Sequence, residues 1–392
     1  MAAAGEADAD CAAGLAPCFL DCEPDAAVVD LEPDHSEWAD LEPFFFDEAA
    51  ALADHKRRVQ REQEEAHKKQ LLEARRAAER AALDRIYDYD PKLGRPYYTR
   101  IEFVDLATFD LDEESPLGPM RETEASIDVQ GTVCREEDGK EEFVPCSSAN
   151  VFSVKIISSD VGFPIDVYGS VIARDILDLK YVYLFRCDRD HSQLILTKDE
   201  SLILTGPKRG LALAYQIYFE FDLKIKGDTR QRDKPLSKGY ITLYGVSLIC
   251  QDEMAVETDI IDSRLSDVAI TYAVVKRAAT FAAEVVQGSF YGEIAARTTS
   301  IRDSIVLYDS KQVTEAMDGN ASGRGVIQLM RRVVAVGLKE KLIVTVAART
   351  GDGKTKSMTI RFTPGASGGD EKEISCGFMK MRLNVTWSII KR

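Results

Sequence analysis

The sequence predicts a mainly β C-terminal domain, antiparallel, sandwich-like and internally duplicated, preceded by a long α-helix and a disordered acidic N-terminus. Three observations support this fold class. A Tyr-Gly passage at residues 168–174 returns at residues 291–297, and each copy leads into an apolar run and a loop ending in Arg-Gly. From about residue 149, many short runs alternate between apolar and polar residues and are separated by Gly and Pro. A stretch without Gly or Pro, dense in Ala, Arg, Lys and Glu, precedes them.

Residues 1–46 are expected to form a disordered acidic tail. The first 54 residues contain 15 Asp or Glu and no Lys or Arg, and they show no apolar periodicity. Large apolar side chains among these carboxylates are typical of segments that fold onto a protein partner. These candidate interaction residues are Trp38, Leu41, Phe44 and Phe45. A local alternative is that Phe46 staples the following helix and Asp47 caps it.

Residues 47–87 are predicted to form a long charged helix, which Pro91 then stops. Leu52, Val59 and Ala66 are spaced as in a heptad. An apolar stripe in which small Ala dominates continues after them, with Leu71, Ala74, Ala78 and Ala81. Two interpretations stay open. The helix is either solvated and held by opposite charges three and four residues apart, or it docks on a partner or on a second copy of itself.

Residues 88–148 are expected to be an extended linker, and residues 149–392 a single β-rich domain resembling one sandwich. The longest alternating run covers residues 211–226. A strand of that length exceeds the usual strand, so a bend or bulge is expected within it. The alternation assigns Phe219 and Phe221 to the core and the residues between them to solvent.

Composition excludes several classes of function. The net charge of −16 comes almost entirely from the first 54 residues, so no basic face for nucleic acid is expected. No membrane span or secretory signal is recognisable, which predicts a cytoplasmic protein, with the nucleus as an alternative. The eight Cys are scattered without a Cys-x-x-Cys pair and there are four His, so no metal or other cofactor is expected.

Several motifs resemble those of a known family. In the first half they are PIDVYG (164–169), YLFR (183–186), SLILTGPKRG (201–210) and FDLKIK (221–226). In the second half they are LSKG (236–239), VLYDS (306–310) and WS (387–388). Together they resemble a grass-type plant family catalogued as a domain of unknown function, DUF number 6598. Because some relatives are fused to a ribosome-inactivating N-glycosidase domain, the resemblance implies stress or defence biology, but no chemistry in this domain.

Two motifs support an enzyme as the alternative function. Residues 365–369 fit the Gly-x-Ser-x-Gly elbow of a serine hydrolase with Ser367 as nucleophile, but a helix must follow the serine and the residues there indicate a strand. Glu73 and Arg76 match the core motif of ribosome-inactivating glycosidases, which lies in a buried cleft. Here the motif lies on a charged helix, so the match carries little weight.

Lys208 and Arg209 are the remaining candidate interaction residues. They lie between Pro207 and Gly210, where a turn can hold an anion, although a solvated hairpin tip is the simpler interpretation. The sequence thus predicts a non-catalytic interaction protein, a β-rich binding module with a helical docking or self-association arm. Its protein partner is not identified, and neither nucleic acid nor membrane is expected as a partner.

Overall fold

The computed structural model describes residues 47–118, 145–245, 255–286, 291–312, 326–349, 354–365, 367–376 and 379–390. The chain divides into two compact units, Met1–Lys68 and Lys69–Arg392, and every strand belongs to the second. Trp38, Leu41, Phe44 and Phe45 lie outside the described residues.

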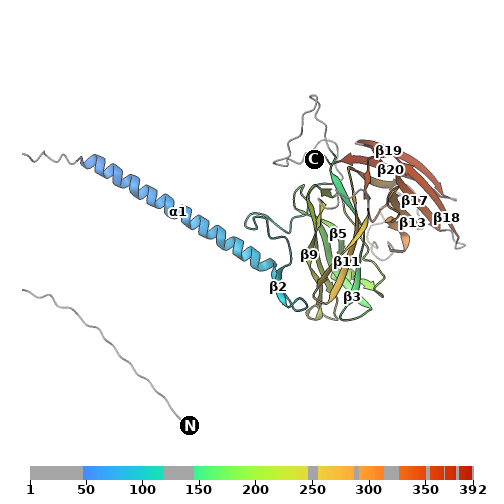
Figure 1. Ribbon diagram of the computed structural model, residues 1–392, viewed down its shortest axis with the longest axis horizontal. Helices are drawn as coiled ribbons and strands as arrows, with labels where there is room; N and C mark the ends of the chain where they lie inside the picture. Colours follow the sequence, from blue (N-terminus) through green and yellow to red (C-terminus); the bar gives the residue numbers. More distant parts are fainter. Residues whose placement is uncertain are drawn as a thin grey trace, which may run out of the picture. The chain divides into compact units, whose positions relative to one another are not determined.

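The predicted helix is confirmed as α1 (Glu48–Ile86) (Figure 1). Asp47 caps it, since its Oδ1 accepts hydrogen bonds from the backbone N–H groups of Ala49 and Ala50, each at 3.0 Å. The helix ends where the chain enters a hairpin of β1 (Tyr87–Asp90) and β2 (Arg95–Tyr98). Phe46, the other residue expected at this helix start, lies outside the described residues.

The segment after the hairpin is not the extended linker that was expected. Over its described part it folds into turns that pack on the β region, and we call residues 99–115 the roof segment. Its side chains Ile101, Leu106 and Leu111 are buried, and they form one cluster with Tyr218 and the end of α1. These apolar residues are too few to form a core of their own. They are buried instead against the sheet that contains Tyr218.

The first sandwich is built from β3 to β11. One sheet has the order β10-β11-β3-β7 and the other β5-β4-β8-β9, with β6 beside β4 and all pairs antiparallel. Short 3-10 turns, η1 (Arg189–His191) and η2 (Arg230–Arg232), lie in its loops. The strands are β3 (Ser147–Ser159), β4 (Ile165–Arg174), β5 (Tyr181–Cys187), β6 (Gln193–Ile195), β7 (Ala212–Leu213), β8 (Gln216–Ile225), β9 (Lys234–Tyr244), β10 (Val256–Ser263) and β11 (Ser266–Val275).

The second sandwich is built from β12 to β20. One sheet has the order β15-β12-β20-β19, with β16 also beside β12, and the other β14-β13-β17-β18. The strands are β12 (Ala278–Val286), β13 (Gly292–Thr298), β14 (Ile305–Asp309), β15 (Val326–Ile327), β16 (Val333–Gly337), β17 (Leu342–Arg349), β18 (Thr355–Phe362), β19 (Ser367–Cys376) and β20 (Met379–Ile389).

The internal duplication predicted from the sequence is present in the topology. Seven strands correspond between the two sandwiches: β12, β13, β14, β17, β18, β19 and β20 take the places of β3, β4, β5, β8, β9, β10 and β11 in the strand orders. The edge beside β3 is formed by β7, and the edge beside β12 by β15 and β16. The repeated glycines, Gly169 and Gly292, occupy equivalent strands, and both have positive φ. A register shift follows each of them at the same offset, between Val171 and Ile172 and between Ile294 and Ala295. The repeated Tyr-Gly passage therefore marks an irregular strand used twice.

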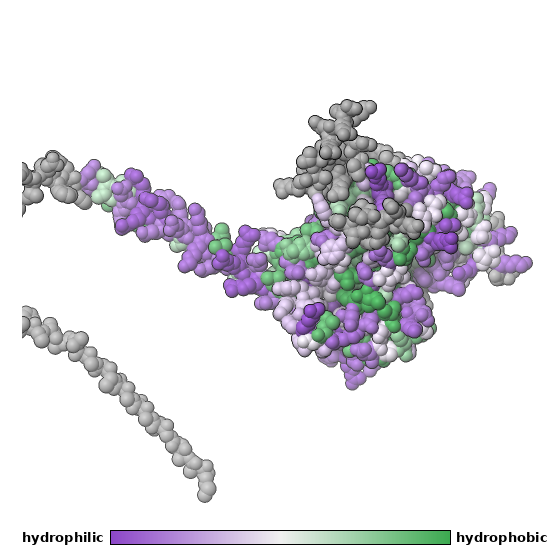
Figure 2. Space-filling view, in the orientation of Figure 1, coloured by the Kyte–Doolittle hydropathy of each residue, from purple (hydrophilic) through white to green (hydrophobic). Residues whose placement is uncertain are grey.

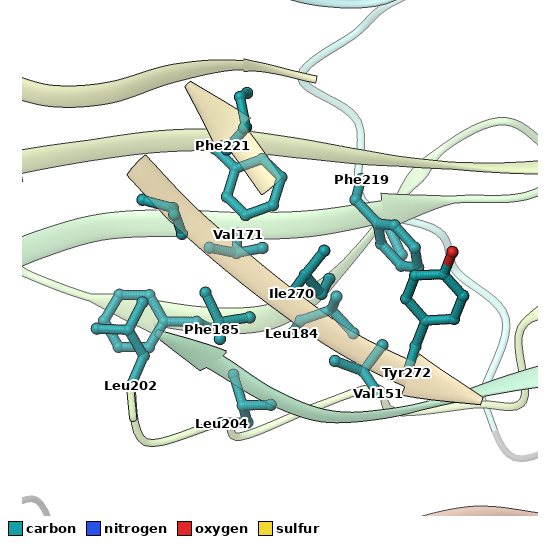
Figure 3. Packing of buried hydrophobic residues seen from close by; sticks show 14 of the residues in the cluster. Val151, Val171, Leu184, Phe185, Leu202, Leu204, Phe219, Phe221, Ile270 and Tyr272 are labelled. Atoms are coloured by element: carbon teal, nitrogen blue, oxygen red, sulfur yellow. The ribbon is translucent and has the colours of Figure 1, made fainter. Parts of the chain in front are cut away.

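The duplication gives two sandwiches, not the single one that was expected, because each copy has its own core. In the first core, Phe219 of β8 packs on Tyr272 of the facing sheet with ring centroids 6.1 Å apart (Figure 3). In the second, Phe281 of β12 contacts Phe362 of the facing sheet, and its ring lies 5.7 Å from that of Trp387. Each copy contributes both sheets around its own core, so each closes on itself.

The long alternating run bends as predicted, and the bend has a topological role. Residues 214–215 separate β7 from β8, so the chain leaves one sheet of the first sandwich and enters the other. Phe219 and Phe221 are buried as predicted. Tyr218 and Glu220, assigned to solvent, are buried too, because the roof segment covers that face of β8.

Backbone hydrogen bonds join the start of the first sandwich to the end of the second. The N–H of Cys146 donates to the carbonyl of Ile390 at 2.8 Å, and the N–H of Ala278 donates to the carbonyl of Cys146 at 3.0 Å. Asn150 exchanges two hydrogen bonds with the backbone of Ala335, at 2.7 and 2.9 Å. We call these contacts the seam.

Candidate functional site

Most of helix α1 carries no packed side chains. Every residue in the range 60–81 is exposed, and the only buried side chains of the helix are Ala82 and Ile86. Figure 2 shows that its surface is mainly hydrophilic, interrupted by a few apolar side chains. The large ones are Leu52, Leu71 and Leu72, with exposed fractions of 54%, 66% and 49%. A helix in this state gains little stability from tertiary contacts.

Local pairs and one tertiary contact support the helix. Arg58 pairs with Glu62 at 3.8 Å, and Gln60 donates to Glu64 at 3.1 Å. Arg75 pairs with Asp105 of the roof segment at 2.6 Å. Exposed pairs of this kind contribute only a few tenths of a kcal/mol each, so they do not replace a packed face.

Lys208 and Arg209 are not at a solvated hairpin tip, and they do not form an open anion site. The guanidinium of Arg209 is fully buried and forms a bidentate ion pair with Asp175. It also donates to Ser115 Oγ at 3.3 Å, and Lys208 pairs with Glu114 at 2.6 Å. These two basic residues hold the end of the roof segment on the first sandwich.

A second charged cluster lies under the roof segment, centred on Glu220. Its carboxylate accepts hydrogen bonds from Arg174 at 2.8 and 3.1 Å, from Arg100 at 3.0 Å and from the backbone N–H of Ile101 at 3.4 Å. Both arginines also donate to the carbonyl of Leu111, at 2.6 and 2.7 Å. The sequence analysis missed this cluster. Alternation gave no signal for it, since Glu220 lies among the polar residues Asp222 and Lys224 that alternate along β8.

Beside this cluster lies a polar pocket of 280 Å³ on the outer face of β4, β5 and β8. Tyr181 and Tyr183 line it, together with Ser170 and Asp222. The hydrogen bond with Tyr183, followed by burial, raises the pKa of Tyr181 to about 12, so its phenol stays protonated at neutral pH. These groups can donate and accept hydrogen bonds to a polar ligand. Glu220 and Arg100, which also line the pocket, already form an ion pair with each other.

The enzyme alternatives can be compared with this geometry. Ser367 is the first residue of β19 and pairs with Ser388, so a strand follows it where a nucleophile elbow requires a helix. The serine-hydrolase interpretation is therefore wrong. Glu73 and Arg76 lie on the exposed part of α1, without a cleft around them. Among the described residues, no group of three or more His, Cys, Asp or Glu is arranged to hold a metal, and no helix is long and apolar enough to cross a membrane.

Comparison with known proteins gives one informative match. Residues 148–385 match the model of a family described as a domain of unknown function, DUF6598. No curated protein matches the chain.

Among solved structures, human GIVD cytosolic phospholipase A2 matches with a TM-score of 0.22 and 8% identity, over 63% of this chain and 31% of that chain. This chain thus spans about a third of the phospholipase's length. The C2A and C2B domains of extended-synaptotagmin 2 match with a TM-score of 0.21 and 10% identity, over 66% of this chain and 98% of that one. TM-scores this low carry no argument about fold or function.

Proposed function

Since the chain belongs to the family of the domain of unknown function DUF6598, whose name assigns no activity, we propose a non-catalytic role for it, as an interaction protein in which α1 is a self-association arm. The observation that carries this proposal is the exposed stretch of helix at residues 60–81 with Leu71 and Leu72 on its surface. A long helix with unpacked leucines is stabilised when another helix covers them.

The second copy of α1 is the favoured occupant for two reasons. Leu71 begins an exposed stripe with Ala74, Ala78 and Ala81, whose spacing of three and four residues is the pattern of a helix that packs on its own kind. The helix also carries interspersed acidic and basic residues, so that two copies can pair Glu with Arg or Lys. The apolar contacts of the roof segment with α1 lie at the last turns of the helix, and nearer to Leu71 the roof segment makes only the exposed ion pair of Asp105 with Arg75 among the described residues.

The test uses the full chain with Leu71→Glu and Leu72→Glu introduced together. We expect the wild-type chain to be a dimer or larger by light scattering and the variant to be monomeric. Losing two buried leucines per copy should weaken association at least about 100-fold. The melting temperature should stay unchanged, because neither leucine is buried within the chain. The matched control, Gln63→Glu with Gln70→Glu, changes the charge equally at exposed positions and should still associate.

Two results would overturn the proposed arm. One is a wild-type chain that stays monomeric at every concentration, and the other is a leucine variant that associates as well as the control. A truncation that tests the same point has to stop before Ala82, because Ala82 and Ile86 are buried with the roof segment. Plant origin, a role in stress or defence and a place in the cytoplasm remain predictions from the sequence.

A further inference from the structure

Arg331, in the loop between β15 and β16, is a buried cation with no counter-ion among the described residues. Its side chain is 3% exposed. Nε donates to the carbonyl of Gly206 at 2.9 Å, and Nη2 donates to the carbonyl of Val151 at 2.7 Å. No Asp or Glu in the described part of the chain pairs with it, and Nη1 has no hydrogen-bond partner there. A guanidinium has five N–H donors, of which these two bonds use two.

The other fully buried arginines show how this chain normally treats such a group. Arg174 is paired with Glu220, and Arg209 is paired with Asp175. Each of these cations therefore has a carboxylate at hydrogen-bond distance. Arg331 differs from both, although burial of an uncompensated charge is costly. Burial lowers the pKa of Arg331 to about 10, so the group still carries its charge at neutral pH.

Arg331 lines a pocket of 410 Å³ between the two sandwiches, within the size range of small-molecule sites. The first sandwich contributes Phe152 and the loop at residues 201–204, and the second contributes Val306 and Met330. The lining thus combines these apolar side chains with a buried cation and with polar residues, which are Gln193, Glu200, Ser201, Gln312 and the exposed Ser304.

We propose that this pocket binds a small organic acid, with its carboxylate on Arg331 and its apolar body against Phe152, Val306 and Met330. The carboxylate supplies the counter-ion that Glu220 and Asp175 supply to the other two arginines. Because the ligand contacts both sandwiches, it also fixes one against the other. This site is separate from the helical arm, and neither depends on the other.

Two features of the pocket bear on this assignment. Arg331 joins the sandwiches through two carbonyls, which alone would make it a structural clamp. Two hydrogen bonds to carbonyl groups do not require a charged side chain, however. The carbonyl groups also do not neutralise the charge of Arg331. Glu200 also lines the pocket, but its carboxylate accepts from the backbone N–H of Leu196 at 3.1 Å and makes no ion pair with Arg331. It should weaken the binding of an anion.

The experiment measures binding of octanoate to the full chain by calorimetry, with 1-octanol as the neutral probe and inorganic phosphate as the anion without an apolar body. Octanoate should bind and raise the melting temperature, whereas octanol and phosphate should bind at least about 10-fold more weakly. Arg331→Met should lose at least about 10-fold in octanoate affinity. Glu200→Gln should bind octanoate more tightly.

The matched control is Arg332→Met, since Arg332 is the exposed neighbour and its guanidinium donates to Gln328 at 2.7 Å. It should bind octanoate like the wild type. Ser304→Trp puts a bulky ring at another residue that lines the pocket and leaves Arg331 in place, so it carries the test if Arg331→Met fails to fold, and it should abolish binding. The proposal is overturned if octanol or phosphate binds as well as octanoate, if octanoate does not bind, or if both pocket variants bind octanoate normally.

Discussion

The carboxylate of Asp233 joins two loops of the first sandwich to strand β4. Arg189 donates to it twice, at 2.8 and 3.1 Å, and Tyr168 and the backbone N–H of Gly227 each donate at 2.8 Å. The hydrogen bond from Arg189 is the main reason that the pKa of Asp233 lies well below the ordinary range of an aspartate. The folded chain therefore favours the ionised form more than the unfolded chain does.

This linkage predicts acid sensitivity. A carboxyl whose folded pKa is lowered stabilises the fold above its unfolded pKa of about 4, and that contribution is lost as the pH falls towards the folded pKa. Asp233→Asn removes the titrating group, so the variant should melt lower than the wild type at pH 7. Its melting temperature should also fall less steeply with acidification below about pH 4. Melting curves across that range test it, and equal steepness in the two proteins would contradict the assignment.

Lys208 and Arg209 show where residue-level prediction from sequence stops. Their neighbours Pro207 and Gly210 indicate a turn, and turns are usually solvated. Burial of Arg209 is decided instead by Asp175 and Ser115, which are distant in sequence and adjacent only after folding. No pattern in the sequence around Arg209 predicts its contacts with Asp175 and Ser115.

At the scale of elements, the roof segment is a structural part of the first sandwich. Ile101 is fully buried in its cluster, and the main chain beside it is held by Glu220. Truncating Ile101→Ala should therefore lower the free energy of unfolding by about 2 to 5 kcal/mol. Denaturant unfolding measures this, with Leu196→Ala, a 55% exposed position, as the control expected to cost about 0.5 kcal/mol or less. A cost at Ile101 no larger than the control would mean that the roof segment is loosely attached.

The elements themselves were largely readable from the sequence. The run without Gly or Pro gave the helix, and alternation gave the inward face of β8, with Phe219 and Phe221 in the core. The alternating pattern gave the wrong exposure for Tyr218 and Glu220. It assumes that one face of the strand is solvated, but here the roof segment covers that face. The same limit explains why residues 88–118 were read as a linker.

At the scale of the whole molecule, the two sandwiches should contribute to stability as independent cores. Phe219 belongs to the first core and Ile294 to the second. Phe219→Ala should cost about 3 to 5 kcal/mol and Ile294→Val about 0.5 to 1.5 kcal/mol. The double variant should show their sum within about 0.5 kcal/mol, because the two sites share no packing partners. Denaturant unfolding of all four proteins tests this, and a larger deviation would indicate a single coupled core.

The repeated Tyr-Gly passage was enough to predict duplication, but not the number of sandwiches. Periodicity reports which face of a strand is buried, while the choice of the opposing sheet depends on contacts between distant strands. The interdomain pocket could not be predicted for the same reason. Arg331 and Val151 come from different copies of the repeat, and nothing near either residue in the sequence points to the other.

The seam between Cys146 and Ile390 bears on the order in which the molecule can form during translation. All strands of the first sandwich are synthesised before β12, so that core can assemble while the ribosome is still extending the chain. The backbone partner of Cys146, however, follows the last strand, β20. The hydrogen bond from Cys146 to Ile390 can therefore form only after the second sandwich has emerged, so the two halves dock after the first core has assembled.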